Sequence, residues 1–137
     1  MTLFVDTSAW YAAADAGDRN NQRAQKVLSA AESLVTSDHV LVESWLLLHH
    51  RLHRNAAERF WEAIRAGGAA LEPVGLADLQ SAWAVGQAFA DHDFSIVDRT
   101  SFAVMERLGI DRVATFDSDF AVYRFGRDRR RAFTIVG

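Results

Sequence analysis

Short apolar runs that alternate with longer helical patterns constrain the fold of this chain most strongly. Residues 2–5, Thr-Leu-Phe-Val, form such a run that ends at Asp6, which is typical of a buried strand. Four further strands are predicted, at residues 33–36, 69–74, 112–116 and 132–136. Two helical patterns lie in each of the three connections between the first four strands, so these connections must cross over the sheet. The sequence therefore predicts an α/β fold, a three-layer α/β/α sandwich with a mainly parallel central sheet.

The helices are predicted from apolar spacing and from residues that favour helix ends. Helical patterns begin near Ser8 and near Arg19, and further patterns cover residues 39–53, 56–66, 76–90 and 98–108. The predicted N-caps are Asp18, Ser37 or Asp38, and Asn55, and the predicted C-terminal stops are Gly67–Gly68 and Gly109. The helix over residues 39–53 is so rich in Val, Leu and Trp that we expect it to be largely buried.

The composition is that of one folded domain spanning residues 1–137. Half of the residues are hydrophobic, which excludes an intrinsically disordered chain. The absence of cysteine excludes disulfides, zinc–thiolate sites and cysteine nucleophiles, and it fits a reducing cytosol. The longest apolar stretches fall far short of the roughly 20 residues that span a bilayer, and no secretion signal is recognisable. We therefore expect a cytoplasmic protein with no membrane partner.

Four acidic residues fall where an α/β fold gathers its ligands. Asp6 ends the first predicted strand and Asp117 follows the fourth, so both point to the carboxyl edge of the sheet. Glu43 and Asp98 lie early in predicted helices, each within strongly apolar sequence. A charge in such surroundings needs a partner, a bound ion or a shifted pKa.

Carboxylates gathered in one cleft repel one another, and a proton or a divalent cation relieves the repulsion. Oxygen ligands without cysteine favour Mg²⁺ or Mn²⁺ over zinc, and such an ion can orient a phosphodiester and activate water. Taken singly, each acid also has a structural interpretation. Asp98 suits a helix N-cap, Asp6 a strand end or helix cap, and Asp117 a turn, as does Asp119.

The phrases around these acids resemble the PIN-domain family, and within it the VapC-type toxins of bacterial toxin–antitoxin pairs. The four phrases occur in the family's order and cover essentially the whole chain: Val-Asp6-Thr-Ser-Ala-Trp, Leu-Val-Glu43-Ser-Trp, Asp93-Phe-Ser-Ile-Val-Asp98-Arg-Thr-Ser-Phe-Ala-Val-Met, and Ala-Thr-Phe-Asp117-Ser-Asp119-Phe. The resemblance implies a Mg²⁺- or Mn²⁺-dependent endoribonuclease in which a metal-activated water hydrolyses RNA. It also implies a homodimer, and a cognate antitoxin that covers the active site.

The resemblance also implies roles for individual residues. Asp6, Glu43, Asp98 and Asp117 match the family's acidic quartet as catalytic metal ligands, and Asp119 is a further possible ligand. Supporting positions around the quartet, which would orient the ligands through hydrogen bonds, are Thr7, Ser8, Asp93 and Ser101. The hypothesis places the principal metal on Asp6 and Asp98, with Glu43 and Asp117 completing its shell or holding a second ion.

A basic stretch near the C-terminus offers a possible RNA contact. Five arginines fall between residues 124 and 131, namely Arg124, Arg127, Arg129, Arg130 and Arg131. The formal net charge is −3, but setting aside six acids that could face a metal leaves 12 acidic against 15 basic residues. The stretch is either a solvated surface run or a phosphate-binding patch.

Other patterns are weaker. The spacing of His49, His50 and His53 could suggest zinc, but no zincin motif accompanies it. Trp10 either packs or stacks on a base, and we favour packing. Trp45, Trp61 and Trp83 are predicted in the core or in a dimer contact. A PIN-type nuclease of RNA maturation or of structured DNA, and a non-catalytic RNA- or protein-binding module, remain the alternative functions.

Overall fold

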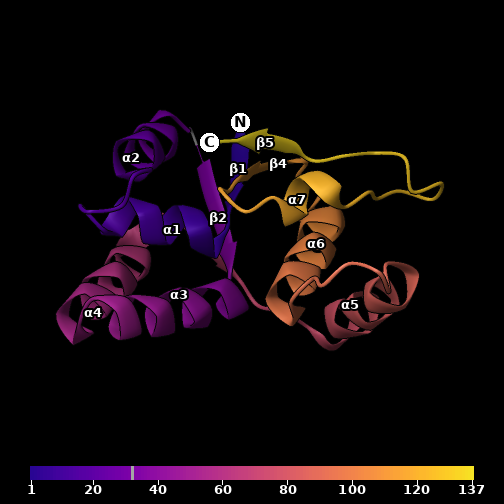
Figure 1. Cartoon of the computed structure of the whole chain (residues 1–137), viewed down its shortest axis with the longest axis horizontal. Helices are drawn as coiled ribbons and strands as arrows, with labels where there is room; N and C mark the ends of the chain where they lie inside the picture. The colour runs from indigo at the N-terminus through magenta and orange to yellow at the C-terminus, as the bar shows by residue number, and fades with distance from the viewer. Residues whose placement is uncertain (32) are drawn as a thin grey trace.

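Five parallel strands form the centre of the molecule. The computed structural model describes residues 1–31 and 33–137. The strands are β1 (Thr2–Val5), β2 (Ser33–Ser37), β3 (Ala70–Glu72), β4 (Arg112–Ala114) and β5 (Thr134–Val136). Their order in the sheet is β3-β2-β1-β4-β5, and every neighbouring pair is parallel (Figure 1). The predicted parallel sheet is therefore confirmed.

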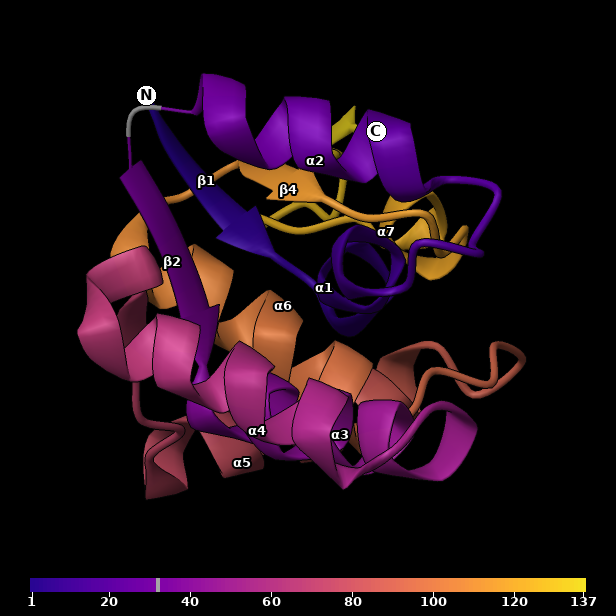
Figure 2. The same ribbon diagram turned by 90° about the vertical axis from the view of Figure 1, so that its left-hand side faces the viewer.

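Helices cover both faces of this sheet. They are α1 (Thr7–Ala14), α2 (Asn21–Ala30), α3 (Asp38–Arg51), α4 (Arg54–Ala63), α5 (Leu76–Ala88), α6 (Ile96–Leu108) and α7 (Asp119–Val122), and a π-helical turn, η1 (Ile64–Gly68), continues α4. Figure 2 shows α2 along one face of the sheet and α3 to α6 on the opposite side. The three-layer architecture is confirmed. The short α7 was not predicted, because a single helical turn leaves no periodic signal.

Three predicted helix ends are confirmed and two are wrong. The Ser37 hydroxyl accepts from the amide of Val40 at 3.1 Å, Gly109 takes the left-handed conformation that ends α6, and α4 with its π-helical turn ends at the Gly67–Gly68 pair. At α4 the cap is His53, whose Nδ1 accepts from the Ala56 amide at 3.1 Å, and Asn55 lies inside the helix. Asn20, rather than Asp18, directly precedes α2, because Asp18 closes a turn by accepting from the amide of Asn20.

The prediction that the helix over residues 39–53 is largely buried is wrong. Val42 and Leu46 on α3 are each 57% exposed. Helices α1, α4 and α6 contact α3, and they bury Val40, Leu41 and Leu48. The apolar composition of this helix therefore exceeds what its packing uses, and part of its apolar surface faces solvent.

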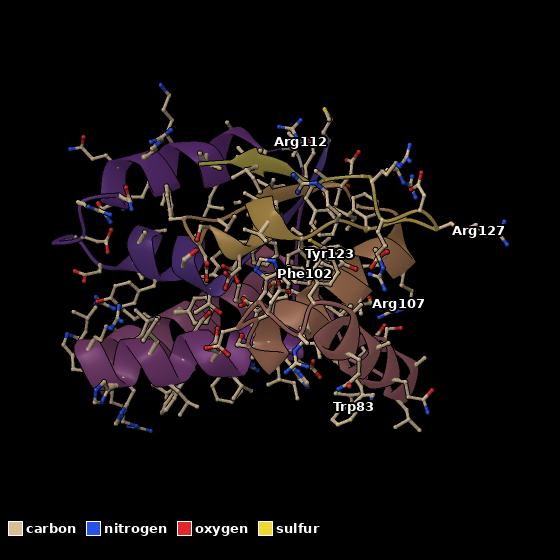
Figure 3. The ribbon with its side chains drawn as sticks, turned by 45° about the vertical axis from the view of Figure 1, so that its right-hand side comes forward. Trp83, Phe102, Arg107, Arg112, Tyr123 and Arg127 are labelled. Carbon is tan, nitrogen blue, oxygen red and sulfur yellow. The ribbon has the colours of Figure 1, made fainter. Side chains whose placement is uncertain are left out.

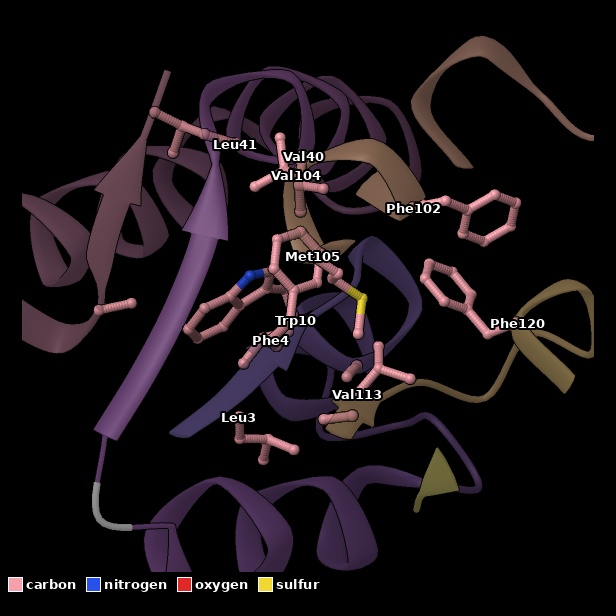
Figure 4. Packing of buried hydrophobic residues seen from close by; sticks show 14 of the residues in the cluster. Leu3, Phe4, Trp10, Val40, Leu41, Phe102, Val104, Met105, Val113 and Phe120 are labelled. Atoms are coloured by element: carbon pink, nitrogen blue, oxygen red, sulfur yellow. The ribbon is translucent and has the colours of Figure 1, made fainter. Parts of the chain in front are cut away.

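The core lies between the sheet and helices α3 and α6. Phe4 of β1, Val40 of α3, Val104 and Met105 of α6 and Val113 of β4 are completely buried there (Figure 4). Each such side chain contributes about 1.5–3 kcal/mol by burial. This packing fixes β1 and α6, the two elements that carry Asp6 and Asp98, relative to each other.

An aromatic cluster joins α6 to the C-terminal part of the chain. The ring of Phe102 on α6 stacks on Tyr123 at 4.1 Å between centroids and meets the edge of Phe120 at 5.0 Å. Tyr123 and Phe102 lie together in Figure 3. Because Phe120 lies in α7 and follows Asp119 directly, the cluster brings the start of α7 close to the start of α6.

None of the helices formed by the described residues is long and apolar enough to cross a membrane.

Candidate active site

The order of the strands creates a crevice at the carboxyl ends of β1 and β4. From β1 the chain proceeds to β2 and β3 on one side, and then returns past β1 to form β4 and β5. Ligands of open parallel sheets bind where the direction of winding reverses in this way. The amide of Asp6, just after β1, donates to the carbonyl of Ala114, the last residue of β4, at 3.0 Å. The carboxylates that follow the two strands are therefore brought to one place.

A cleft of about 290 Å³ opens at this point, and all four predicted carboxylates line it. Asp6 comes from the end of β1, Glu43 from the second turn of α3, Asp98 from the first turn of α6, and Asp117 from the loop after β4. Residues more than 100 positions apart in the sequence thus meet at one edge of the sheet. The structure brings together the residues that the sequence placed on separate elements.

Asp6 is held rigidly at the base of the cleft. It is 3% exposed, and its Oδ2 accepts hydrogen bonds from the hydroxyls of Ser8 at 3.0 Å and Thr115 at 2.9 Å. Burial raises the pKa of Asp6 to about 6, and the hydrogen bonds from Thr115 and Ser8 oppose this rise. When such a buried and oriented carboxylate ionises, a bound cation strongly stabilises its charged form.

Asp98 combines a structural role with a position in the cleft. The Ser95 hydroxyl accepts from the Asp98 amide at 3.0 Å, and the Asp98 carboxylate accepts from the Ser95 amide at 3.3 Å, which forms a capping box. Ser95 is therefore the N-cap, and α6 begins at Ile96, two residues before the predicted start. Burial, a hydrogen bond with Asp119 and the negative charges of Asp6 and Asp117 all raise the pKa of Asp98.

Asp98, Asp117 and Asp119 form a group that could hold a metal ion. Each offers a carboxylate oxygen, and these atoms lie within 4.8 Å of one another. The Asp119 amide donates to Oδ1 of Asp117 at 2.9 Å, and the Asp117 amide donates to the hydroxyl of Thr115 at 3.0 Å. Oxygen donors at this spacing suit a hard divalent cation. The buried hydroxyl of Thr7, which also lines the cleft, has no hydrogen-bond partner among the described residues and so remains available there.

The model of the PIN-domain family matches residues 3–126. The chain belongs to the PIN-domain family. A relative from Mycobacterium tuberculosis, named the 23S rRNA-specific endonuclease VapC20, is 38% identical over 125 residues, which cover 90% of this chain and 95% of the relative. The chain is thus a homologue of a toxin endonuclease, and the predicted resemblance is confirmed.

Two solved structures resemble this PIN domain. The crystal structure of M. tuberculosis VapC20, described as a sarcin–ricin loop cleaving toxin, has a TM-score of 0.83 and 36% sequence identity, and the match covers 88% of this chain and 93% of that one. A toxin–antitoxin complex from Klebsiella pneumoniae has a TM-score of 0.66 at 13% identity, and it covers 85% of this chain and 88% of that one. The second likeness shows the shared fold alone.

The predicted supporting residues of this PIN domain differ in their contacts. Ser8 binds Asp6 directly and also accepts from the amide of Phe116 at 2.9 Å. Thr7 and Ser101 are buried, and neither hydroxyl has a hydrogen-bond partner among the described residues. Asp93 is exposed and is absent from the lining of the cleft. The predicted role of Asp93 in orienting the ligands therefore stays a prediction.

The predicted basic patch lies elsewhere on the surface. None of its arginines lines the cleft. The guanidinium of Arg124 donates to nearby backbone carbonyls, and that of Arg129 lies over the ring of Phe89 and donates to the hydroxyl of Tyr123. Arg127 lies at the outer end of the loop, pointing away from the molecule (Figure 3). Contact of Arg124, Arg127, Arg129 and Arg130 with RNA stays a prediction, because the structure does not bring them to the carboxylates.

The aromatic and histidine patterns receive structural explanations. Trp10 is buried, packs against Phe60 at 5.5 Å and donates to the hydroxyl of Thr36 at 3.2 Å, which confirms packing over base stacking. Trp83 is 69% exposed and Trp61 is also exposed, so neither is a core residue. His53 caps α4 and His49 stacks on Trp45, which leaves the zinc interpretation without support.

Two functional features were missed from the sequence. Thr115 links Asp6 to the backbone of Asp117, and its signal was a hydroxyl residue at a strand end, two positions before an acid. Arg51 lines the same cleft as the carboxylates. Its position could have been noticed because it lies eight residues, or about two turns, after Glu43 on the same helix.

Proposed function

We propose that this PIN domain is the toxin of a toxin–antitoxin pair and that it hydrolyses RNA with Mg²⁺ or Mn²⁺ held by Asp6, Glu43, Asp98 and Asp117, with Asp119 as a further ligand. The observation that carries the proposal is the convergence of these carboxylates at the point where the sheet reverses its winding. When bound, the cation offsets negative charge on the phosphodiester and lowers the pKa of a coordinated water.

The protein's own residues prepare this site. Ser8 and Thr115 fix the orientation of the Asp6 carboxylate, and Ser95 fixes that of Asp98. Such contacts keep each oxygen in place, so the ligands need little reorganisation when an ion enters. Without an ion, the raised pKa values of Asp6 and Asp98 keep protons in the cleft, and these protons leave when the cation binds.

The substrate class follows from the relative. VapC20 is named for cleavage of 23S rRNA, and 38% identity over nearly its whole length supports a related target for this chain. We therefore propose that a ribosomal RNA hairpin loop is the substrate.

The proposed biological unit has three parts. Residues 1–137 form one nuclease domain that acts in the cytoplasm and pairs with a second copy of itself. A cognate antitoxin covers the cleft and keeps the enzyme inactive. The identity to VapC20 supports the toxin class and with it an antitoxin partner. The second copy is proposed from the family resemblance, and light scattering of the purified protein tests it.

The test of the enzyme is cleavage of purified ribosomal RNA, followed by sequencing of the new ends. We expect discrete fragments with Mg²⁺ or Mn²⁺, none with EDTA, and none from an Asp6→Asn variant that unfolds at a temperature close to that of the wild type. Cleavage that persists in EDTA, or in Asp6→Asn after removal of contaminating nucleases, would overturn the proposal.

A further inference from the structure

Arg51 is the cation of the active-site cleft. It is the last residue of α3, and it is the only basic side chain among the described residues that line the cleft. Glu43, Leu47 and Arg51 follow one another at four-residue steps and all line it, so one face of α3 forms this wall. Eight residues of helix place Arg51 about 12 Å from Glu43 along the helix axis.

The guanidinium of Arg51 is oriented by an aromatic ring. Its Cζ lies 5.1 Å from the ring centroid of Tyr11, a residue of α1 that is itself buried. The hydroxyl of Tyr11 donates to Asp15 at 2.6 Å, which fixes the ring. A guanidinium above a fixed ring loses little further freedom when it binds a ligand.

Among the described residues, no carboxylate forms an ion pair with Arg51 within 4 Å, although the pKa of the Asp15 carboxyl is lowered by its hydrogen bond from Tyr11 and, to a lesser extent, by the positive charge of Arg51. Two arginines of the following helical segment differ in this respect: Arg54 pairs with Glu58 at 2.9 Å and Arg65 with Glu62 at 2.8 Å. Arg51 is exposed and lines the cleft, and no close ion pair occupies its planar set of donors, so it can bind an anion there.

We propose that Arg51 binds a backbone phosphate of the RNA that flanks the scissile phosphate, and so sets the position of the strand across the carboxylates. This inference rests on the proposed function, because the RNA must enter the cleft. We assign Arg51 to a neighbouring phosphate, since about two turns of α3 separate it from Glu43. Guanidinium groups recognise phosphate through paired hydrogen bonds.

Steady-state cleavage of an RNA hairpin by Arg51→Ala tests this role. We expect KM to rise about tenfold, the effect of losing one charge-assisted contact, with kcat within about twofold of the wild type. Arg51→Lys should recover part of the lost affinity, because it restores the charge without the planar donors. Arg54→Ala is the matched control. Arg54 carries the same charge and lies three residues after Arg51, but its side chain is 76% exposed and does not line the cleft.

The salt dependence of RNA binding is a second measurement. It would not change if Arg51 only supported the fold. In an Asp6→Asn background, which prevents cleavage, the affinity for the same RNA is measured over a range of salt concentrations. Arg51→Ala should reduce the slope of log K against log salt by about 0.7 on a single strand, the value of one phosphate contact. Arg54→Ala should leave the slope unchanged.

The outcomes separate the inference from the proposed function. A wild type that cleaves RNA while Arg51→Ala keeps the wild-type KM and salt slope overturns the role of Arg51 and leaves the nuclease intact. A fall in kcat at constant KM also overturns it, because Arg51 would then act on the reacting phosphate. If the wild type fails to cleave, the proposed function is lost, and the binding measurements still decide whether Arg51 contacts RNA.

Discussion

Asp6 sits where a carboxylate is difficult to ionise and is nevertheless held for use. Its burial at the end of β1 opposes the charge, while Ser8 and Thr115 direct two hydroxyls at the same oxygen. A carboxylate required only for stability would be served by an arginine or lysine partner, as Asp78 is served by Arg107. Asp6 has hydroxyl partners instead, and these keep it available to a cation.

The raised pKa of Asp6 predicts how stability depends on pH. In the folded protein the pKa is about 6, above the ordinary value of 3.8, so the native state binds more protons than the unfolded state between these values. The contribution of Asp6 to stability is therefore complete below pH 4 and is lost as the pH rises through 6. In metal-free protein, raising the pH from 4.5 to 7.5 should lower the free energy of unfolding of the wild type by about 2 kcal/mol relative to that of Asp6→Asn. Urea denaturation at the two pH values measures this shift, and a shift in the opposite direction would contradict it.

Thr115 should matter for activity more than its neutral side chain suggests. It donates to Asp6 and accepts from the amide of Asp117, so it holds two of the proposed ligands. Thr115→Val keeps the shape and removes both contacts, and we expect about a tenfold to hundredfold loss of cleavage or metal affinity. Thr115→Ser is the control, because it retains the hydroxyl. Equal activity of the Val and Ser variants would show that orientation by Thr115 is unimportant.

At the scale of secondary-structure elements, contacts at both ends of α6 hold this helix in position. The capping box of Ser95 and Asp98 fixes the first turn, and the rings of Phe102, Phe120 and Tyr123 hold α7 beside it. At the other end, Arg107 (labelled in Figure 3) lies beside α5. It donates to Asp78 on α5 and to Glu72 on β3. The position of the metal-binding group is thus a property of the packed helices rather than of the loop alone.

The anchor at the C-terminal end of α6 predicts a stability effect. Asp78 is buried, and its hydrogen bonds with Arg107 lower its pKa, so Arg107→Ala would leave a buried carboxylate without its partner. We expect the free energy of unfolding to fall by about 2–3 kcal/mol. Arg65→Ala, which breaks the exposed pair with Glu62, is the control and should cost less than about 0.5 kcal/mol. Comparable losses in the two variants, measured by denaturant unfolding, would argue against the anchor.

At the scale of the whole molecule, the sequence predicted the sheet and the meeting of the carboxylates because both follow from chain order. Strands separated by helices must be parallel, and acids that follow such strands must lie at one edge. The exposure of Val42 and Leu46 could not be predicted in this way, because it depends on which neighbouring helices cover α3. The same holds for Arg51, whose place in the cleft is set by the packing of α1 against α3.

Metal binding should couple the site to the stability of the whole fold. The carboxylates come from β1, α3, α6 and the loop after β4, so an ion that joins them is bound by the native state and not by the unfolded chain. At a Mg²⁺ or Mn²⁺ concentration ten times the Kd, the gain in stability is about 1.4 kcal/mol. Because the ion must displace protons from Asp6 and Asp98, the gain should be largest at pH 7.5 and small at pH 5.

Thermal unfolding with increasing Mg²⁺ or Mn²⁺ measures this gain at each pH, with choline chloride of equal ionic strength as the salt control. Asp98→Asn should lose the metal-dependent increase in Tm. Without metal at pH 7.5 it should be more stable than the wild type by about 1–2 kcal/mol, because folding of the wild type must protonate Asp98 against its ordinary pKa, whereas Asn needs no proton. The amide of this variant can still accept the hydrogen bond from Ser95, so the capping box is retained. An unchanged response to the cation in Asp98→Asn would mean that the ion binds elsewhere on the molecule. A response that grows as the pH falls would mean that its ligands are not these buried acids.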